Sequence, residues 1–301
     1  MLAISFLLLA QSVPDLVERA RIGGCEPVRA ALVAAYRDSR DSIEDKRLAG
    51  LALAQCDIAK ERFAEAWPVV NELRAAFPAD ADVLYLAAKL HLRGWNDVVY
   101  QMFQKTPASF RVNQVSAEIF ELQGRFADAA AEYRKAITKA PDALNLHYRL
   151  GRALLLESHT TENFAAAIRE FEAELKINPA DAAAEYQIGQ ILVASQRSAV
   201  AVARFEKAVK LDAQFVEPVI ALSKIRMEQK QFAVAIEMLE KAVAQAPRNE
   251  AARYSLMLAY RNAGRPVDAR KQKEELDKLQ KPPEGEFTEF LKKLGEKPKQ
   301  P

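Results

Sequence analysis

The chain has 301 residues, of which 50% are hydrophobic and 28% charged, and this composition is typical of an ordered soluble protein. Its 43 basic and 41 acidic residues leave a formal net charge of +2. Nucleic-acid binding usually needs a clustered basic face, so this balance predicts no nucleic-acid partner. The few glycines and the many Ala, Leu, Glu, Lys and Arg residues favour helix along nearly the whole chain.

The first twelve residues carry no charged side chain, and Leu2–Ala10 is an apolar run. A run of nine residues is too short to cross a bilayer, so we expect no integral membrane span. They fit a short secretory signal peptide at residues 1–12, cleaved near Ser12, although its start lacks Lys and Arg. We therefore expect a periplasmic or secreted protein. If the segment is instead a buried start, the protein is cytoplasmic.

Cys25 and Cys56 are the only cysteines of the chain. In an exported protein an even number permits a disulfide, which would stabilise the fold by about 3–4 kcal/mol through loop closure. The alternative is two buried free thiols that act as small apolar side chains. Neither cysteine belongs to a CxxC pair, which leaves little support for a redox or zinc role.

Residues 13–46 form a degenerate helical hairpin in our prediction. Its helices are expected at Pro14–Ile22 and Glu26–Ser39, joined by a turn at Gly23 and Gly24. The end units of a solenoid are often atypical because they cap the stack.

From Arg47 onward the sequence repeats. Similar segments begin at Ala201 and Ala235, and a step of the same length leads from Ala235 to Ala269. A fixed period of this size indicates a solenoid of stacked units rather than one closed core. Divergent units occupy 47–109, and a regular array occupies 110–283. The units of the array are 110–143, 144–181, 182–215, 216–249 and 250–283.

Each unit is predicted to contain two amphipathic helices joined by a tight polar turn. In the unit 216–249 we expect the first helix at Glu217–Gln229 and the second at Phe232–Gln245. Pro247 then ends the second helix, since it lacks an amide proton and its ring blocks helix continuation. Pro78, Pro141 and Pro179 are expected to act in the same way.

The pattern inside the units resembles the tetratricopeptide repeat (TPR) family. The resemblance covers residues 110–280 well and residues 47–80 moderately. It implies an all-α fold, a right-handed superhelical solenoid of antiparallel helix pairs, and a protein that binds other proteins. In the unit 110–143 every signature position of the family is matched, by Ala117, Phe120, Gly124, Phe126, Ala129, Tyr133, Ala136 and Pro141.

Packing explains these residue types. Gly124 and Gly264 are expected in a left-handed conformation at the turns between helices. Tyr133, Phe171 and Phe205 are expected to fill the gap towards the next unit. Small residues are needed where the two helices of a unit approach most closely, because a larger side chain would push the backbones apart. These small residues are Ala129, Ala167, Ala201, Ala235 and Ala269.

Two units depart from the pattern. The unit 81–109 is five residues short, and Trp95 lies near its expected turn. The unit 144–181 has four extra residues, which predict a longer turn at 157–163. The same unit carries Glu174 where the family has alanine.

The last segment, 284–301, follows a helix-breaking Lys281-Pro282-Pro283 sequence. Its composition predicts a mobile tail. The alternative is a docking helix or a partner peptide, because four apolar residues stand in helical register. These residues are Phe287, Phe290, Leu291 and Leu294.

No catalytic, cofactor or metal site is predicted. His91, His147 and His159 have no second His, Cys or paired acid at metal-ligand spacing. Phosphate-loop, dinucleotide-binding, nucleophile-elbow and zinc-protease motifs do not occur. The abundant acidic residues are explained as solvated helix faces. We therefore predict that the chain is not an enzyme and needs no cofactor.

The resemblance implies a binding site on the concave face, which the first helix of each unit lines. Tyrosine recurs at one position of three units, and it offers apolar area and a hydroxyl at low entropy cost. The alternative is that these tyrosines only shield the packing between helices. The predicted partner-binding residues are Arg111, Gln114, Asn145, Tyr148, Arg152, Tyr186, Gln190, Lys224, Tyr254, Arg261 and Asn262.

These observations predict a non-enzymatic scaffold that binds a peptide or partner protein in its concave groove, in the bacterial cell envelope. An alternative is an accessory subunit of an envelope enzyme or secretion complex. A third is a helical enzyme acting on cell-wall glycan, which would need two recessed carboxylates about 5–10 Å apart.

Overall fold

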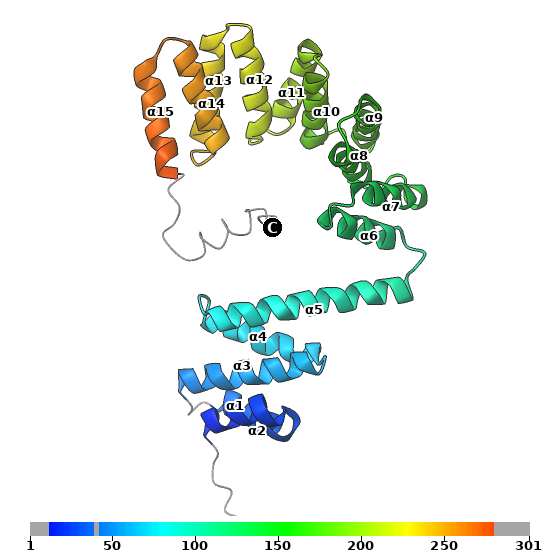
Figure 1. Ribbon diagram of the computed structural model, residues 1–301, viewed down its shortest axis with the longest axis vertical. Helices are drawn as coiled ribbons and strands as arrows, with labels where there is room; N and C mark the ends of the chain where they lie inside the picture. The colour runs from blue at the N-terminus through cyan, green and yellow to red at the C-terminus, as the bar shows by residue number, and fades with distance from the viewer. Residues whose placement is uncertain (1–11, 39–41, 280–301) are drawn as a thin grey trace, which may run out of the picture. The chain divides into compact units, whose positions relative to one another are not determined.

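The computed structural model describes residues 12–38 and 42–279, and every regular element in these ranges is an α-helix (Figure 1). The chain divides into two compact units, Met1–Ala108 and Ser109–Pro301. The predicted all-α solenoid of antiparallel helix pairs is confirmed. None of the described helices is both long and apolar enough to span a membrane.

The first unit is organised around α3, which packs against each of the other helices described in this unit. One apolar cluster joins Leu32 and Leu53, and a second joins Ile58, Val70 and Leu86, so α3 has a core on two sides. The helices of this unit are α1 (Val13–Gly23), α2 (Glu26–Arg37), α3 (Ile43–Ala59), α4 (Phe63–Ala76) and α5 (Ala81–Lys105).

The predicted N-terminal hairpin is present as α1 and α2. Ser12 begins α1, and its hydroxyl accepts a hydrogen bond from the backbone N–H of Asp15 at 3.3 Å. A disulfide joins Cys25, just before α2, to Cys56 in α3, with a Cα–Cα distance of 5.3 Å. The hairpin is therefore tied covalently to the central helix of the unit. The predicted signal peptide lies, apart from Ser12, outside the described residues.

A buried ionic cluster lies beside the disulfide at the C-terminal end of α3. Asp57 is 1% exposed, and its carboxylate accepts hydrogen bonds from Arg29 of α2 at 2.6 Å and from Arg62 at 2.7 Å. Two arginines on one carboxylate compensate for its loss of water. Asp57 thus ties α2 to the turn that leads into α4.

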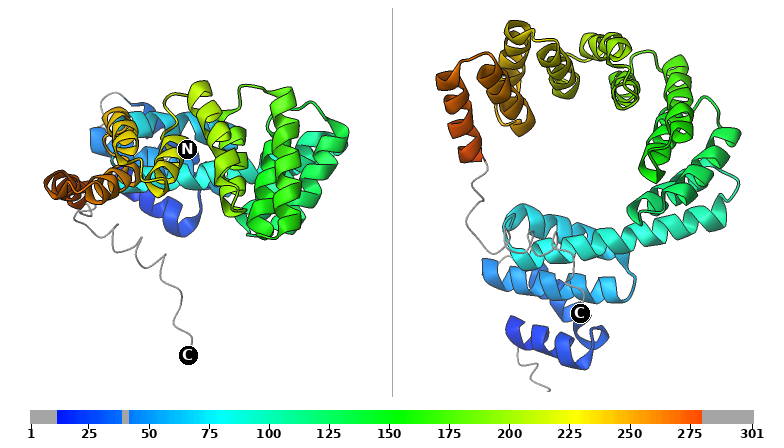
Figure 2. Two further views of the ribbon diagram at one scale, coloured as in Figure 1. Left: turned by 90° about the horizontal axis from the view of Figure 1, so that it is seen from above. Right: turned by 45° about the horizontal axis from the view of Figure 1, so that its top comes forward.

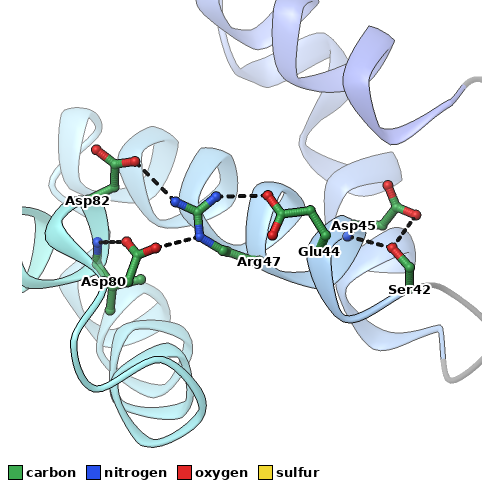
Figure 3. A network of polar contacts seen from close by, with 7 residues as sticks. Ser42, Glu44, Asp45, Arg47, Asp80 and Asp82 are labelled. Atoms are coloured by element: carbon green, nitrogen blue, oxygen red, sulfur yellow. Dashed lines mark hydrogen bonds and ion pairs between the residues drawn. The ribbon is translucent and has the colours of Figure 1, made fainter.

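Arg47 connects α3 with the start of α5 (Figure 3). Its guanidinium donates to Asp80 at 2.7 Å, to Glu44 at 2.9 Å and to Asp82 at 3.1 Å. Asp80 also accepts the backbone N–H of Val83 at 2.9 Å, so it is the N-cap of α5. The Asp80 side chain therefore caps the start of α5 and also ties it to α3.

The expectation of two helices in the unit 81–109 is wrong. The single helix α5 runs for 25 residues and passes straight through Trp95. Five turns between paired helices contain a residue with positive φ, and Gly94 does not have one. The helical hydrogen bonds of α5 therefore continue across the expected turn.

The second unit is a succession of helical hairpins, and each helix packs against the one before and the one after (Figures 1 and 2). In Figure 1, α6 and α8 lie on the inner side of this unit's curve, and α7 and α9 lie on its outer side. The helices are α6 (Phe110–Leu122), α7 (Phe126–Lys139), α8 (Leu146–Glu157), α9 (Thr161–Ile177), α10 (Ala182–Ala194), α11 (Ser198–Leu211), α12 (Val216–Glu228), α13 (Phe232–Gln245), α14 (Glu250–Asn262) and α15 (Pro266–Leu279).

The repeated alanines are buried as predicted. Four of them are 0% exposed, and Ala269, in the last hairpin, is 9% exposed. Phe205 is also fully buried, and its ring lies against Gly189 in the same unit, where an added Cβ would come within 2.4 Å of it. Phe171 packs on Gly151 in the same manner, and a Cβ added at Gly151 would come within 2.8 Å of its ring. These rings therefore fill a space that the facing glycine leaves within their own unit.

Five of the turns between paired helices share one backbone conformation, whereas the turn between α8 and α9 has no residue with positive φ. Gly124 and Gly264 both have φ of +72°, which confirms the predicted left-handed turn. Glu61, Gln196 and Lys230 occupy the matching position in other units and also have positive φ, between 57° and 61°. The turn geometry is thus kept even where the sequence has no glycine.

The long turn expected at 157–163 is wrong. Helix α8 ends at Glu157 and α9 begins at Thr161, so the extra residues mainly lengthen α9 at its start. Thr160 causes this early start, because its hydroxyl caps the backbone N–H of Asn163 at 3.2 Å.

Glu174 has a structural role in the same unit. It is 0% exposed, and its carboxylate accepts the backbone N–H groups of Asn145 at 2.8 Å and Tyr148 at 3.3 Å. Asn145 makes no capping bond with its own side chain. Glu174 therefore caps α8 from a neighbouring helix, which explains the departure from alanine.

Candidate partner-binding groove

The first helices of three consecutive hairpins, α10, α12 and α14, line one groove of about 320 Å³. Side chains four residues apart lie on the same helix face, which is why Tyr186 and Gln190 of α10 both reach it. The groove residues are Tyr186, Gln190, Val193, Glu217, Ile220, Ala221, Lys224, Ile225, Glu228 and Ala251.

The floor of the groove is apolar and its edges are charged. Ile220 and Ile225 are buried beneath it. Lys224, Glu217 and Glu228 are exposed and make no ion pair among the described residues. The lining carries one positive and two negative side chains, so a ligand can bury an apolar side chain and bring a positive charge.

Tyr186 shields the packing between helices and also borders the groove. Its ring packs against Phe205 and Phe215, with centroid distances of 5.8 and 5.1 Å, so it does shield packing. It is also half-buried at the edge of the groove. Burial, helped by the nearby Glu217 carboxylate, raises the pKa of Tyr186, so its hydroxyl is protonated and can donate to a ligand.

The predicted residues do not form one continuous site. The groove brings together Tyr186, Gln190 and Lys224. Tyr254 and Arg261 lie instead on a second hollow, of about 530 Å³, between α14 and α15. Asn262 is exposed at the end of α14.

The remaining predicted residues lie on α6 and α8. Arg111 donates to Gln114 at 2.7 Å, so these two side chains are already paired. Tyr148 is half-buried against Phe171, with ring centroids 5.6 Å apart, while Arg152 is exposed. For these residues, and for the exposed Asn145, a role in partner binding stays a prediction.

Sequence reasoning missed three groove residues on α12: Ala221, Ile225 and Glu228. The spacing of Glu217, Ala221, Lys224 and Glu228 is that of one helix face, so the signal was present. It is weak because α12 is apolar on several sides.

Sequence profiles of the tetratricopeptide repeat family match residues 121–162, 160–214 and 226–283, which together make up just over half of the chain. The chain belongs to the tetratricopeptide repeat family. Proteins with TPR arrays are in general interaction scaffolds, and the family of this chain supports that general role. Among its described residues, no three His, Cys, Asp or Glu side chains are grouped to hold a metal ion.

Solved structures share the fold of this TPR chain. PilF of Pseudomonas aeruginosa is 14% identical, with a TM-score of 0.51 over 83% of this chain and 98% of that one. A double mutant of MamA from Desulfovibrio magneticus RS-1 is 17% identical, with a TM-score of 0.50 over 57% and 94%. At such identities the likeness shows the fold alone. No curated protein sequence matches the chain.

Proposed function

We propose that this TPR chain is a non-enzymatic scaffold that binds a segment of a partner protein in the groove of α10, α12 and α14. The observation that carries the proposal is the apolar floor at Ile220 and Ile225, bordered by a tyrosine hydroxyl and by charges that make no ion pair with any residue the structure describes. An apolar side chain of the partner would lie on this floor. Gln190 offers both a donor and an acceptor to the partner backbone.

The charges restrict the partner further. Glu217 and Glu228 stand on either side of Lys224 on the exposed face of α12. A partner segment with a basic residue near its apolar anchor would meet the excess negative charge. We therefore expect an apolar residue flanked by Lys or Arg, in an extended or helical segment.

The cell envelope is the compartment that we propose for this function. The apolar segment Leu2–Ala10 and the disulfide between Cys25 and Cys56 support it, because disulfides persist in oxidising compartments. Mass spectrometry of the mature protein tests this part. A mature chain that still begins at Met1 would contradict export.

Site-specific photo-crosslinking in the native host tests the groove. A photo-reactive residue replaces Gln190 or Ala221 in the groove, and Lys241 on the exposed side of α13 serves as the matched control. We expect a discrete adduct from the two groove positions, with the crosslinked peptide carrying an apolar residue beside a basic one. Equal adducts from Lys241, or none from the groove, would refute the site.

A matched pair of charge variants gives a second test. Ala221→Glu places a carboxylate on the groove floor, whereas Lys241→Glu places one on the outer side. We expect the first to abolish crosslinking from Gln190 and the second to leave it unchanged, with helical content equal in both.

A further inference from the structure

Helix α5 has a buried apolar face and a second apolar face that is open. Leu86, Ala87 and Leu90 belong to the apolar cluster that α5 shares with α3 and α4. The second face is a stripe of residues three or four positions apart, which therefore lie on one side of the helix. Its four largest side chains are 42–63% exposed. The residues of this open stripe are Leu84, Ala88, Leu92, Trp95, Val99 and Phe103.

The first half of the open stripe is a face that a second helix covers in other hairpins. Ala54 and Ala117 stand at the repeat position of Ala88, and both are 0% exposed. Each belongs to an apolar cluster with the helix that follows it, α4 or α7. Ala88 is exposed, because α5 continues where the hairpin was expected to turn. The first half of α5 therefore has a pairing face without its paired helix.

The second half of the open stripe corresponds to the paired helix itself. Val99 stands eight residues before Pro107, as Phe171 stands before Pro179. In its own hairpin the Phe171 ring packs on Gly151, which has the repeat position of Ala88. In α5 the two positions are about 16 Å apart along one continuous helix (Figure 1), so they cannot meet within the same chain.

Trp95 opposes a closed hairpin within one chain. It stands twelve residues before Pro107, as Ala129 stands before Pro141. Ala129 is fully buried where the two helices of its hairpin approach most closely, and an indole there would push them apart. Two helices that no short turn connects can pack at the larger distance that the indole needs.

The open stripe is self-complementary. Turned end for end about the midpoint between Arg93 and Gly94, α5 places each stripe residue opposite another stripe residue. The five charged residues of α5 all stand outside the stripe. The nearest of them, Lys89, would lie beside the uncharged Asn96 of the other copy, so like charges do not meet in the contact. The residue pairs are Leu84 with Phe103, Ala88 with Val99, and Leu92 with Trp95.

The size of the stripe is sufficient for a stable contact. The overlap from Leu84 to Phe103 is about 28 Å long. Tyr85, beside the stripe, and Trp95 and Phe103, within it, are 63%, 48% and 42% exposed. At about 200 Å² for each aromatic side chain, these three alone offer about 300 Å² of the ~800 Å² that one partner of a standard interface buries.

We propose that two copies of this chain pair through α5 as an antiparallel, two-fold symmetric dimer. The first half of each α5 packs on the second half of the other, so the contact between Ala88 and Val99 repeats that between Gly151 and Phe171 across two chains. This is a helix swap, which is a low-cost route to a dimer. The pairing uses no residue of the groove of α10, α12 and α14, so it does not depend on what that groove binds.

Cysteine crosslinking tests the partner and the direction. Full-length chains with Ala88→Cys and chains with Val99→Cys are mixed, left to exchange and mildly oxidised. We expect a disulfide-linked dimer with one chain of each kind. Neither variant alone should crosslink, because identical positions lie about 16 Å apart along an antiparallel pair.

Asp97→Cys, on the opposite side of α5, is the matched control. In place of Val99→Cys it should give no crosslink. Absence of the mixed crosslink would overturn the proposal. Crosslinking of Ala88→Cys with itself would show a parallel pair, and would overturn the proposed direction.

The mass of the full chain in solution gives a second test. Analytical ultracentrifugation of the unmodified protein should show a dimer. Trp95→Asp places a charge in the contact and should raise the Kd of the dimer at least ~100-fold. Trp95 is half exposed, so helical content should stay the same. Leu122→Asp, at an exposed apolar residue of α6, should leave the dimer unchanged. A monomer at every concentration, or a dimer that Trp95→Asp does not weaken, would show that something else covers the stripe and would overturn the proposal.

Discussion

In the second unit, buried alanines return at equal intervals from Ala201 to Ala269, whereas the first unit is tied by a disulfide and by the buried Asp57 between two arginines. The second unit repeats the same contact at every hairpin. The first unit instead uses a few long-range links that all converge on α3.

This difference predicts which substitutions destabilise each unit most. A periodic array spreads its stability over many equivalent contacts between neighbours, so a single overpacked pair disturbs one junction. A unit that depends on a few links loses much when one link is removed. The two tryptophans, Trp67 and Trp95, both belong to the first unit, so their fluorescence reports on that unit alone.

Removal of the disulfide should have the largest effect. The variant Cys25→Ser/Cys56→Ser frees a loop with a sequence separation of 31 residues, so the free energy of unfolding of the first unit should fall by about 3–4 kcal/mol. Tryptophan fluorescence in a urea titration measures this loss.

The second unit is the control for this variant. The part of the circular dichroism transition that has no counterpart in the fluorescence transition reports the second unit, and its midpoint should stay that of the unmodified protein, since none of the second unit's residues belongs to the bridge. An unchanged fluorescence midpoint would mean that the disulfide does not hold the first unit together.

Added methyl groups at two helical glycines should have opposite effects in the two units. Gly189→Ala places a Cβ 2.4 Å from the ring of Phe205, so it should destabilise the second unit by about 1–3 kcal/mol. Gly94→Ala meets nothing closer than Trp67 at 3.6 Å, so it should stabilise α5 by about 0.5–1 kcal/mol through helix propensity.

A second substitution checks the cause of the first effect. Phe205→Leu removes the ring from the Cβ added at position 189, so the double variant Gly189→Ala/Phe205→Leu should lose less stability than the sum of the two single variants. Urea titrations followed by circular dichroism measure this cycle. If the two losses in free energy of unfolding simply add, the Phe205 ring does not restrict the space at position 189.

Periodic features could be predicted from the sequence because one rule applies to every repeat. The buried alanines, the left-handed turns at Gly124 and Gly264 and the helix ends before the prolines all follow from register. Tyr186, Gln190 and Lys224 came together in one groove for the same reason.

Insertions and deletions could not be predicted in this way. The loss of five residues in the unit 81–109 removed a turn, and the gain of four residues lengthened α9. The repeat register does not show whether an insertion or a deletion will alter a turn or one of the neighbouring helices. Register likewise did not indicate that Tyr254 lies on the hollow between α14 and α15 rather than on the groove.

Glu174→Ala would restore the family residue, yet it should destabilise the second unit. The carboxylate caps two backbone N–H groups of α8, and loss of a helix cap costs about 1–2 kcal/mol. The exposed neighbour Lys176 provides the control, because Lys176→Ala should change the free energy of unfolding by no more than about 0.5 kcal/mol. Circular dichroism in urea measures both, and a more stable Glu174→Ala would refute the capping role.

The smallest effect should appear as a pH dependence of the second unit. The Nδ1 atom of His147 lies 2.6 Å from the Glu170 carboxylate, and this hydrogen bond, with Glu174 nearby, raises the pKa of His147. A raised pKa in the folded state means that the stabilisation is complete below the unfolded value of about 6.5 and is lost as the pH rises through the folded value. The pair is partly exposed, so the loss should be about 1 kcal/mol or less. Urea midpoints from circular dichroism should therefore decrease above pH 6.5 in the unmodified protein and less so in His147→Gln, and a rise over that range would contradict the ion pair.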